Sequence, residues 1–446
     1  MLILILLVAI AFIVVSTSKW KLHPFIALLI AAYGIAFSVG MKYADIAKTI
    51  TTGFGGILAY IGIVIVLGTI IGVILEKSGA AVKMANVVLR VVGKKRPILA
   101  MSIIGYIVSI PVFCDSGFVI LNALKRSMVK QLKVSGVAMS VALATGLYAT
   151  HTLVPPTPGP IAAAGNLMVG NLGMVIVFGL VVAMFTMLAG YFWAIKVGKS
   201  YQSGEDFDID LEKDSEVQEK YGELPTAFKA FAPIFVPVLL MAIESIVKLS
   251  FKDSSGTMLY KVFVFLGNPA NALFVGVLFA TMLLPKFNEE TLSGWVGQGV
   301  KNAGEILIIT GAGGALGAVL KASGIGDYLG ASLQTLSLGI FVPFIIAAAL
   351  KSAQGSSTTA LVVTSTIMYP LLGSLGLDSE IGKVLTVLAI GAGAMTVSHA
   401  NDSYFWVVSR FSQMDVPTAY KTYTMATLIQ GLVTISIVAI LALFLL

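Results

Sequence analysis

The segment PILAMSIIGYIVSIPVFCDSGFVILNAL, residues 97–124, is apolar at both ends and is interrupted by Pro111 and Gly117. It has 28 residues, whereas two helical crossings of a bilayer need about 40 residues. Lysines and arginines flank it on both sides, which favours the cytoplasmic face for both of its ends. We therefore predict a re-entrant hairpin whose tip, PVFCDSG (111–117), lies at membrane depth, where irregular backbone must be buried in protein or face water.

The whole chain has the composition of a membrane protein. Of its 446 residues, 57% are hydrophobic and 11% are charged, against about 25% charged in soluble domains. The first apolar run, MLILILLVAIAFIVVS (1–16), has no basic segment before it, so we predict a membrane span rather than a signal peptide. We assign the net charge of +7 to basic loops at the inner leaflet, not to nucleic-acid binding. These features predict an all-α, multi-pass protein of the bacterial cytoplasmic (inner) membrane.

The chain divides into two similar membrane halves. An acidic, polar segment, 198–229, predicts a cytoplasmic linker between a first repeat, 1–197, and a second repeat, 230–446. A shift of 245 positions aligns GTIIGVILEKSG (68–79) with GGALGAVLKASG (313–324). The hairpin leaves the first half with an odd number of crossings, so the second half is predicted to enter the membrane inverted. Inverted repeats with re-entrant hairpins and broken helices are typical of secondary transporters.

Non-helical stretches interrupt apolar sequence at corresponding places in both halves. Besides PVFCDSG they are HTLVPPTPGP (151–160), KSAQGSSTT (351–359), which is the tip of a second predicted hairpin, and SHANDS (398–403). A helix that starts inside the membrane offers backbone N–H groups and a partial positive charge, which favour a carboxylate. The predicted substrate-binding residues are therefore those at or beside these helix starts: Ser116, Gly117, Thr152, Thr157, Gln354, Gly355, Ser356, Ser357, Thr358, Thr359, Asn401 and Ser403.

Ionisable side chains within apolar sequence are candidates for proton coupling, because each is costly in the bilayer. We assign this role to Asp115 or Asp402, with His151 and His399 as second choices; Lys351, Glu305 and Glu244 are further ionisable residues in such surroundings. The sequence has no HExxH motif and no paired Cys and His ligands, and its single cysteine is Cys114. We therefore predict no enzymatic activity, no catalytic residue, no metal site and no cofactor.

Several motifs together resemble the gluconate:proton symporter (gluconate permease, GntP) family of the ion-transporter superfamily. They are GFGGILAYIGIVIVLGTIIGVILEKSGAA (53–81), FCDSGFV (113–119), HTLVPPTPGP, AQGSSTTA (353–360) and GAGAMTVSHANDSYFWVVSRF (391–411). The resemblance covers essentially the whole chain. It implies uptake of small hydroxy-carboxylates such as gluconate, other aldonates, glycerate, 3-hydroxybutyrate or D-serine. It also implies a homodimer in which a transport domain moves against a scaffold, as in an elevator.

The chain departs from the gluconate-type pattern at the presumed site. Where those members read FFEVG and PPHPGP, this sequence has Asp115 with Ser116, and Thr157 in place of the histidine. These differences argue against gluconate itself and favour a short hydroxy acid of the 3-hydroxybutyrate type. We predict proton-coupled uptake of a small hydroxy-monocarboxylate by a homodimer in contact with membrane lipid. A sodium-coupled carrier, a D-serine or amino-acid transporter of the same family, and a channel are the alternatives.

Overall fold

The structure, a computed structural model, describes residues 2–93, 95–207, 222–250, 257–323, 339–400 and 402–446. Within these ranges the chain is helical, with no strand. The helices before the linker are α1 Leu2–Ser18, α2 Pro24–Ser38, α3 Tyr43–Lys77, α4 Ala80–Val92, α5 Pro97–Val108, α6 Cys114–Leu132, α7 Gly136–Leu153, α8 Pro158–Asn166 and α9 Leu172–Val197, and the short turn η1 Gly204–Asp206 lies within the linker.

The described helices after the linker follow a similar order. They are α11 Ala227–Ser250, α12 Met258–Gly267, α13 Pro269–Thr281, the π-turn η3 Glu290–Trp295, α14 Val296–Ala322, α16 Phe341–Gln354, α17 Ser357–Met368, the short turns η4 Tyr369–Leu371 and η5 Gly373–Leu375, α18 Glu380–Met395, α19 Ser403–Phe411, α20 Val416–Ala419, η6 Tyr420–Thr424 and α21 Met425–Leu445. In the part of the chain that the structure describes, five helices, counted as continuous where a bend is small, are long and apolar enough to cross a membrane, or up to seven if each of two bent pairs is one span.

The two halves match in element positions. Helices α2 and α13 begin at Pro24 and Pro269, and the broken-off helices α8 and α19 begin at Pro158 and Ser403, both 245 positions apart. Each of α8 and α19 has 9 residues. The common spacing supports an internal repeat, and the inverted relation of the two halves stays a prediction.

The segment 97–124, which is predicted to form a hairpin, lies in a helical hairpin made of α5 and α6. Helix α5 ends at Val108 and α6 begins at Cys114, so the turn between them, 109–113, overlaps the predicted tip, 111–117. The second predicted hairpin is formed by α16 and α17, which meet at Gly355, a residue in the left-handed conformation with φ +89°. Only glycine adopts that conformation without strain, which explains the residue at the tip.

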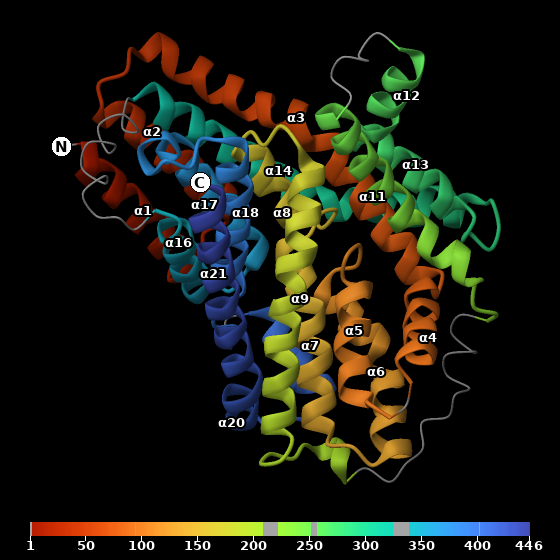
Figure 1. Ribbon diagram of the computed structural model, residues 1–446. Coiled ribbons are helices and arrows are strands. Elements are labelled where there is room, and N and C mark those ends of the chain that lie inside the picture. Colours follow the sequence, from red (N-terminus) through yellow and green to blue (C-terminus); the bar gives the residue numbers. More distant parts are fainter. Residues whose placement is uncertain (1, 94, 208–221, 251–256, 324–338, 401) are drawn as a thin grey trace.

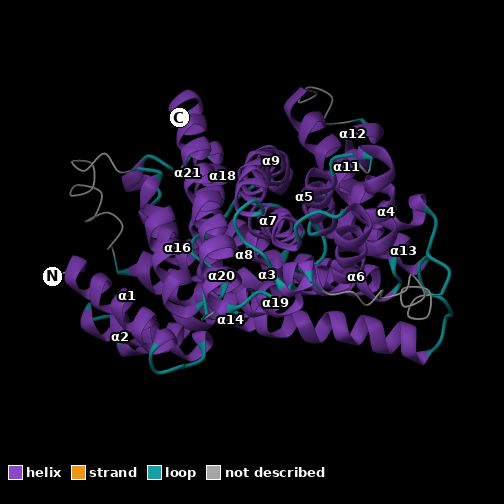
Figure 2. Cartoon of the chain, turned by 90° about the horizontal axis from the view of Figure 1, so that it is seen from below, coloured by secondary structure: helices purple, strands orange, loops and turns teal. Residues whose placement is uncertain are grey.

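Both penultimate spans are broken. Residues 154–157, VPPT, separate α7 from α8, and the segment 396–402, whose residue 401 lies outside the described residues, separates α18 from α19 without a proline or glycine. Helices α5, α7 and α9 stand side by side below α3, which crosses the upper part of the molecule (Figure 1). Seen from below, α7 and α9 lie near the centre, with α18 and α21 on one side and α5 on the other (Figure 2).

Glycines on α3 allow it to lie close to its neighbours. A Cβ atom on Gly53 would stand 2.5 Å from the carbonyl oxygen of Gly314 in α14. Further along α3, a Cβ on Gly68 would stand 2.9 Å from the carbonyl of Pro156, and one on Gly72 would stand 2.7 Å from that of Pro111. Small residues let helix backbones approach in this way. Helix α3 therefore supports both the hairpin tip and the α7–α8 break.

The first residues of the linker are fixed to the ends of α6 and α7. Lys125 is fully buried, and its Nζ lies 2.9 Å from Glu205 Oε1. The same ammonium donates to the hydroxyls of Ser140 and Ser412 at 3.0 and 3.1 Å. Burial raises the pKa of the Glu205 carboxyl, and the Lys125 ammonium opposes that effect. This cluster therefore joins α6 and α7 to the end of α19.

The α3–α14 contact gives the first prediction. Replacing Gly53 with alanine forces α3 away from α14, and overpacking of this kind costs about 1–3 kcal/mol. Gly55→Ala is the matched control, because a Cβ there meets nothing within 4 Å. We expect the apparent melting temperature in detergent to fall for Gly53→Ala and not for Gly55→Ala. Equal melting temperatures for both variants would show that the close helix contact is not needed.

Candidate functional site

A cavity of about 560 Å³ lies among the ends of the broken helices. Its walls come from the first hairpin tip, the last turns of α7, the second hairpin tip with the start of α17, the start of α19, and one face of α14. The lining residues are Phe113, Cys114, Asp115, Ser116, Tyr148, His151, Asn302, Glu305, Ile306, Ile309, Gly355, Ser356, Ser357, Thr358, Thr359, Val362, Asp402, Ser403 and Tyr404.

Three helices begin at this cavity. The first residues of α6, α17 and α19 all belong to its lining. In α17 the Ser356 hydroxyl accepts the Thr359 backbone N–H at 3.2 Å, and in α19 the Asp402 carboxylate accepts that of Tyr404 at 3.0 Å. Helix starts carry partial positive charge and N–H donors without partners in the helix. The cavity therefore has the backbone features that bind a carboxylate.

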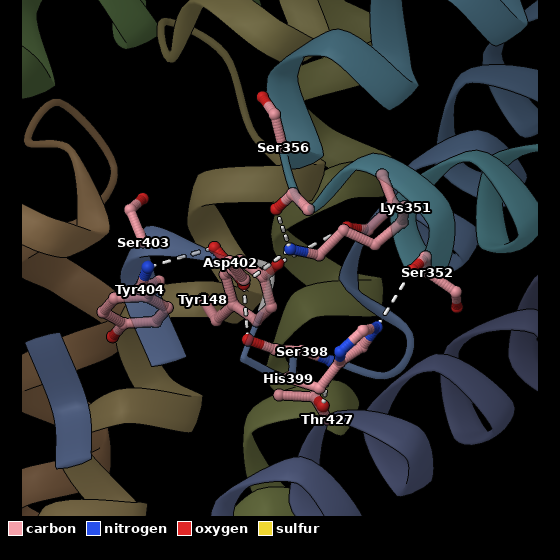
Figure 3. Close-up of polar contacts among 12 residues, drawn as sticks. Tyr148, Lys351, Ser352, Ser356, Ser398, His399, Asp402, Ser403, Tyr404 and Thr427 are labelled. Atoms are coloured by element: carbon pink, nitrogen blue, oxygen red, sulfur yellow. Dashed lines mark hydrogen bonds and ion pairs between the residues drawn. The ribbon is translucent and has the colours of Figure 1, made fainter. Parts of the chain in front are cut away.

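A buried ion pair joins the second hairpin to the α18–α19 break. Lys351 Nζ lies 2.5 Å from Asp402 Oδ2, with both side chains almost fully buried. The ammonium also donates to the carbonyl of Gly355, and the Ser398 hydroxyl donates to the same Asp402 oxygen. Figure 3 shows Lys351 reaching from its helix toward Asp402, whereas His399 points away to the Ser352 carbonyl. The carboxylate of Asp402 is thus neutralised within the protein.

Asp115 is the second carboxylate of the cavity, and its surroundings differ. It is partly buried, and it accepts a hydrogen bond from the Ser403 hydroxyl at 3.3 Å. Among the residues that the structure describes, no cation forms an ion pair with it. Asp115 therefore brings into the cavity a carboxylate that forms no ion pair with a described side chain.

Aromatic rings form the wall behind these polar groups. The rings of Tyr148 and Tyr404 lie 5.2 Å apart, and Tyr404 donates its hydroxyl to the Ala144 carbonyl at 3.0 Å. His151 lies between Tyr148 and Phe113, and its buried Nδ1 has no hydrogen-bond partner. This wall gives the cavity an apolar side next to its polar tips.

The structure brings together most of the residues predicted from the sequence. Those that line the cavity are Asp115, Ser116, His151, Gly355, Ser356, Ser357, Thr358, Thr359, Asp402 and Ser403. Four predicted residues do not line it: Gly117, Thr152, Thr157 and His399. Gly117 packs on Leu147. The hydroxyls of Thr152 and Thr157 donate to the carbonyls of Tyr148 and Val154, and His399 contacts the Ser352 carbonyl. The side chain of Gln354 and the whole of Asn401 lie outside the described residues.

Sequence reasoning missed the aromatic side chains of Tyr148 and Tyr404 and most of the wall formed by α14. Asn302, Ile306 and Ile309 lie on α14, a continuous helix with no break to attract notice. Glu305 also lies on this wall. The sequence shows it as an ionisable residue in an apolar run, and that signal could have marked it as a site residue. Glu244, singled out for the same reason, pairs with Lys248 in α11 and does not line the cavity. Within the described ranges, no group of three or more metal-binding side chains occurs.

Comparisons with known proteins agree with this architecture. The profile of the GntP family permeases matches residues 1–444, so the chain belongs to that family. It is 36% identical to an uncharacterized permease of Haemophilus influenzae over 91% of this chain and 84% of the relative. It is 31% identical to a gluconate permease of Pseudomonas aeruginosa (98% and 97% covered). With the D-serine transporter DsdX of Escherichia coli K12 the identity is 32% (97% and 96%).

Two solved transporters share the fold. The YdaH transporter of Alcanivorax borkumensis superposes with a TM-score of 0.69 over 95% of this chain and 99% of that chain, at 14% identity. MtrF of Neisseria gonorrhoeae gives 0.70 over 96% of each chain, at 16% identity. At this identity the likeness shows the fold alone. Family and fold together show a multi-pass transporter of the bacterial inner membrane, not an enzyme.

The buried ion pair gives the second prediction. Asp402→Asn leaves the Lys351 ammonium buried without its carboxylate, which costs about 3–5 kcal/mol. Asp115→Asn removes no ion pair and costs less than about 1 kcal/mol. We expect a much lower melting temperature in detergent for the first variant alone. The double variant Lys351→Met with Asp402→Asn should recover most of the loss, and a double variant as unstable as Asp402→Asn would refute this role of the pair.

Proposed function

We propose that this GntP family permease is a secondary transporter that takes up a small hydroxy-monocarboxylate together with a proton. The observation that carries the proposal is the pair of carboxylates at one cavity: Asp402 is neutralised by Lys351, and Asp115 has no cationic partner among the described residues. The relatives named as a gluconate permease and a D-serine transporter support a small hydroxylated acid as the substrate class.

Charge balance explains why a proton would accompany the substrate. A carboxylate anion bound near ionised Asp115 is repelled, and the repulsion is strong where little water screens it. A proton on Asp115 removes that repulsion. By linkage, a proton that favours anion binding is itself bound more tightly when the anion is present. Asp115 is therefore the proposed proton site, in preference to Asp402, whose charge Lys351 already balances.

The substrate carboxylate is proposed to lie at the starts of α17 and α19. Ser357, Thr358 and Ser403 belong to the first turns of these helices and line the cavity. Their hydroxyls and the adjacent backbone N–H groups are donors suited to a carboxylate. The remaining volume, from about 560 Å³ in total, is sufficient for the hydroxylated part of a small acid.

The proposed movement is of the elevator type. Helix α14 packs chiefly on α3 and α2, whereas α5 to α9 pack with one another and with α16 to α21. A displacement of the second group against the first would carry the hairpin tips past α14 and across the membrane. The homodimer implied by the family resemblance would anchor the first group.

The proton site gives the third prediction. In proteoliposomes, Asp115→Asn should abolish accumulation of substrate driven by a pH gradient, because the proton has no site. Exchange of labelled for unlabelled substrate needs no net proton movement and should persist. Wild-type uptake should rise as the external pH falls, and the variant should lose this dependence. Gradient-driven accumulation by Asp115→Asn would place the proton elsewhere.

The coupling ion is tested on the wild-type protein. Uptake that continues without sodium and collapses with a protonophore is expected for proton coupling. Uptake that requires sodium would favour the sodium-coupled alternative, and failure to accumulate against a gradient would indicate a channel.

A second candidate substrate class is favoured by the same residue. The unneutralised carboxylate of Asp115 suits the ammonium group of a zwitterion such as D-serine, and one relative is named a D-serine transporter. Competition for uptake among aldonates, glycerate, 3-hydroxybutyrate and D-serine separates the two classes. For a zwitterion, Asp115→Asn should abolish binding and exchange, whereas for a hydroxy acid exchange should persist.

A further inference from the structure

Glu305 stands apart from the other acids of the cavity. It lies within the candidate membrane span Glu290–Ala322, yet its side chain is 72% exposed and lines the cavity. An ionised side chain in such a span costs about 2.5–3.5 kcal/mol unless it faces water. Its position therefore marks a water-accessible part of the cavity, on the α14 wall and not on the tips that carry the helix starts.

His23, at the start of α2, is the neighbour of Glu305. His23 Nε2 lies 3.8 Å from Glu305 Oε1, while His23 Nδ1 accepts the Phe25 backbone N–H at 3.3 Å as the N-cap of α2. Because Nδ1 is an acceptor, the proton of the neutral ring lies on Nε2, which faces the carboxylate.

The charges around the cavity then form a simple pattern. Lys351 balances Asp402, and the proposed proton balances Asp115. Glu305, on the wall formed by α14, adds a third carboxylate to the cavity, and its ion-pair contact among the described residues is with His23, at 3.8 Å. A substrate whose carboxylate lies at the helix starts turns its other end toward the rest of the cavity. A hydroxyl is tolerated beside Glu305, whereas a second carboxylate is repelled.

We propose that Glu305 is a specificity-determining residue that selects acids with one carboxylate and rejects dicarboxylates. This inference rests on the proposed function, since it assumes an anionic substrate at the tips. It concerns a second carboxylate on the ligand. Neither Asp115 nor the helix starts can distinguish a ligand that has this second charge from one that lacks it. Rejection by an unpaired like charge is an established way to obtain specificity.

The test compares acids that differ by a single charge. Uptake of labelled gluconate is competed with gluconate and glucarate, and uptake of labelled 3-hydroxybutyrate with 3-hydroxybutyrate and malate, in proteoliposomes of the full-length protein. The variant is Glu305→Gln, whose amide oxygen can still accept from His23. Glu290→Gln is the control, because it removes an acid that is exposed and does not line the cavity.

In the wild type, the dicarboxylate should compete far more weakly than its monocarboxylate partner. The ratio compared is the half-inhibitory concentration of the dicarboxylate divided by that of its monocarboxylate partner. Glu305→Gln should lower this ratio about tenfold, as expected for removal of one like charge several ångströms from the second carboxylate. The ratio should also shrink at high ionic strength in the wild type but not in the variant, because an exposed charge is screened by salt. Glu290→Gln should keep the wild-type ratio.

Two kinds of failure are distinguishable. A wild type that takes up neither labelled monocarboxylate contradicts the proposed substrate class. A wild type that takes up a monocarboxylate, with an unchanged ratio in Glu305→Gln, contradicts the charge filter alone. Dicarboxylates that compete with the wild type as well as their partners do would also overturn it.

Discussion

A peptide group that leaves a helix inside the membrane must find another partner, because lipid offers none. This constraint governs the centre of the protein, where four segments leave helical structure. Side chains within those segments are some of these partners. The Ser109 hydroxyl donates to the Val112 carbonyl, and the Thr157 hydroxyl donates to the Val154 carbonyl. Ser356 and Asp402 accept backbone N–H groups at the new helix starts. The breaks are stable only because they are buried together.

Burying the breaks together is also what creates a site. Each restarted helix contributes a partial positive charge and unused N–H donors, and the starts of α6, α17 and α19 meet at one cavity. The hairpin and the break of the second half are joined by the Lys351–Asp402 pair, which fixes their relative positions. A buried pair of this kind adds no net charge, so it can organise the tips without competing for an anion. Asp115 has no such ion pair among the residues that the structure describes.

Much of this arrangement could be predicted from the sequence, because length and proline content report on the backbone directly. The hairpin follows from 28 residues that are too few to cross twice, and α6 begins within its predicted tip. Side-chain direction was harder. The hydroxyls of Thr152 and Thr157 bond to carbonyls near them in the chain, as such residues often do in helices. Thr157, which differs from the gluconate-type pattern PPHPGP, therefore does not line the cavity.

The wall formed by α14 could not be predicted from the sequence, for a different reason. Nothing in a continuous apolar helix indicates which of its faces will meet a distant hairpin, since that depends on the packing of α14 against α3 and α2. The wall nevertheless carries the charge that distinguishes it from the tips. If α14 belongs to the stationary group, the tips would bind the carboxylate in every state, whereas Glu305 would face the ligand only where the tips stand beside α14. Affinity and charge selection would then reside on separate bodies, so a dicarboxylate would be discriminated on one side of the membrane and not at the moving site itself.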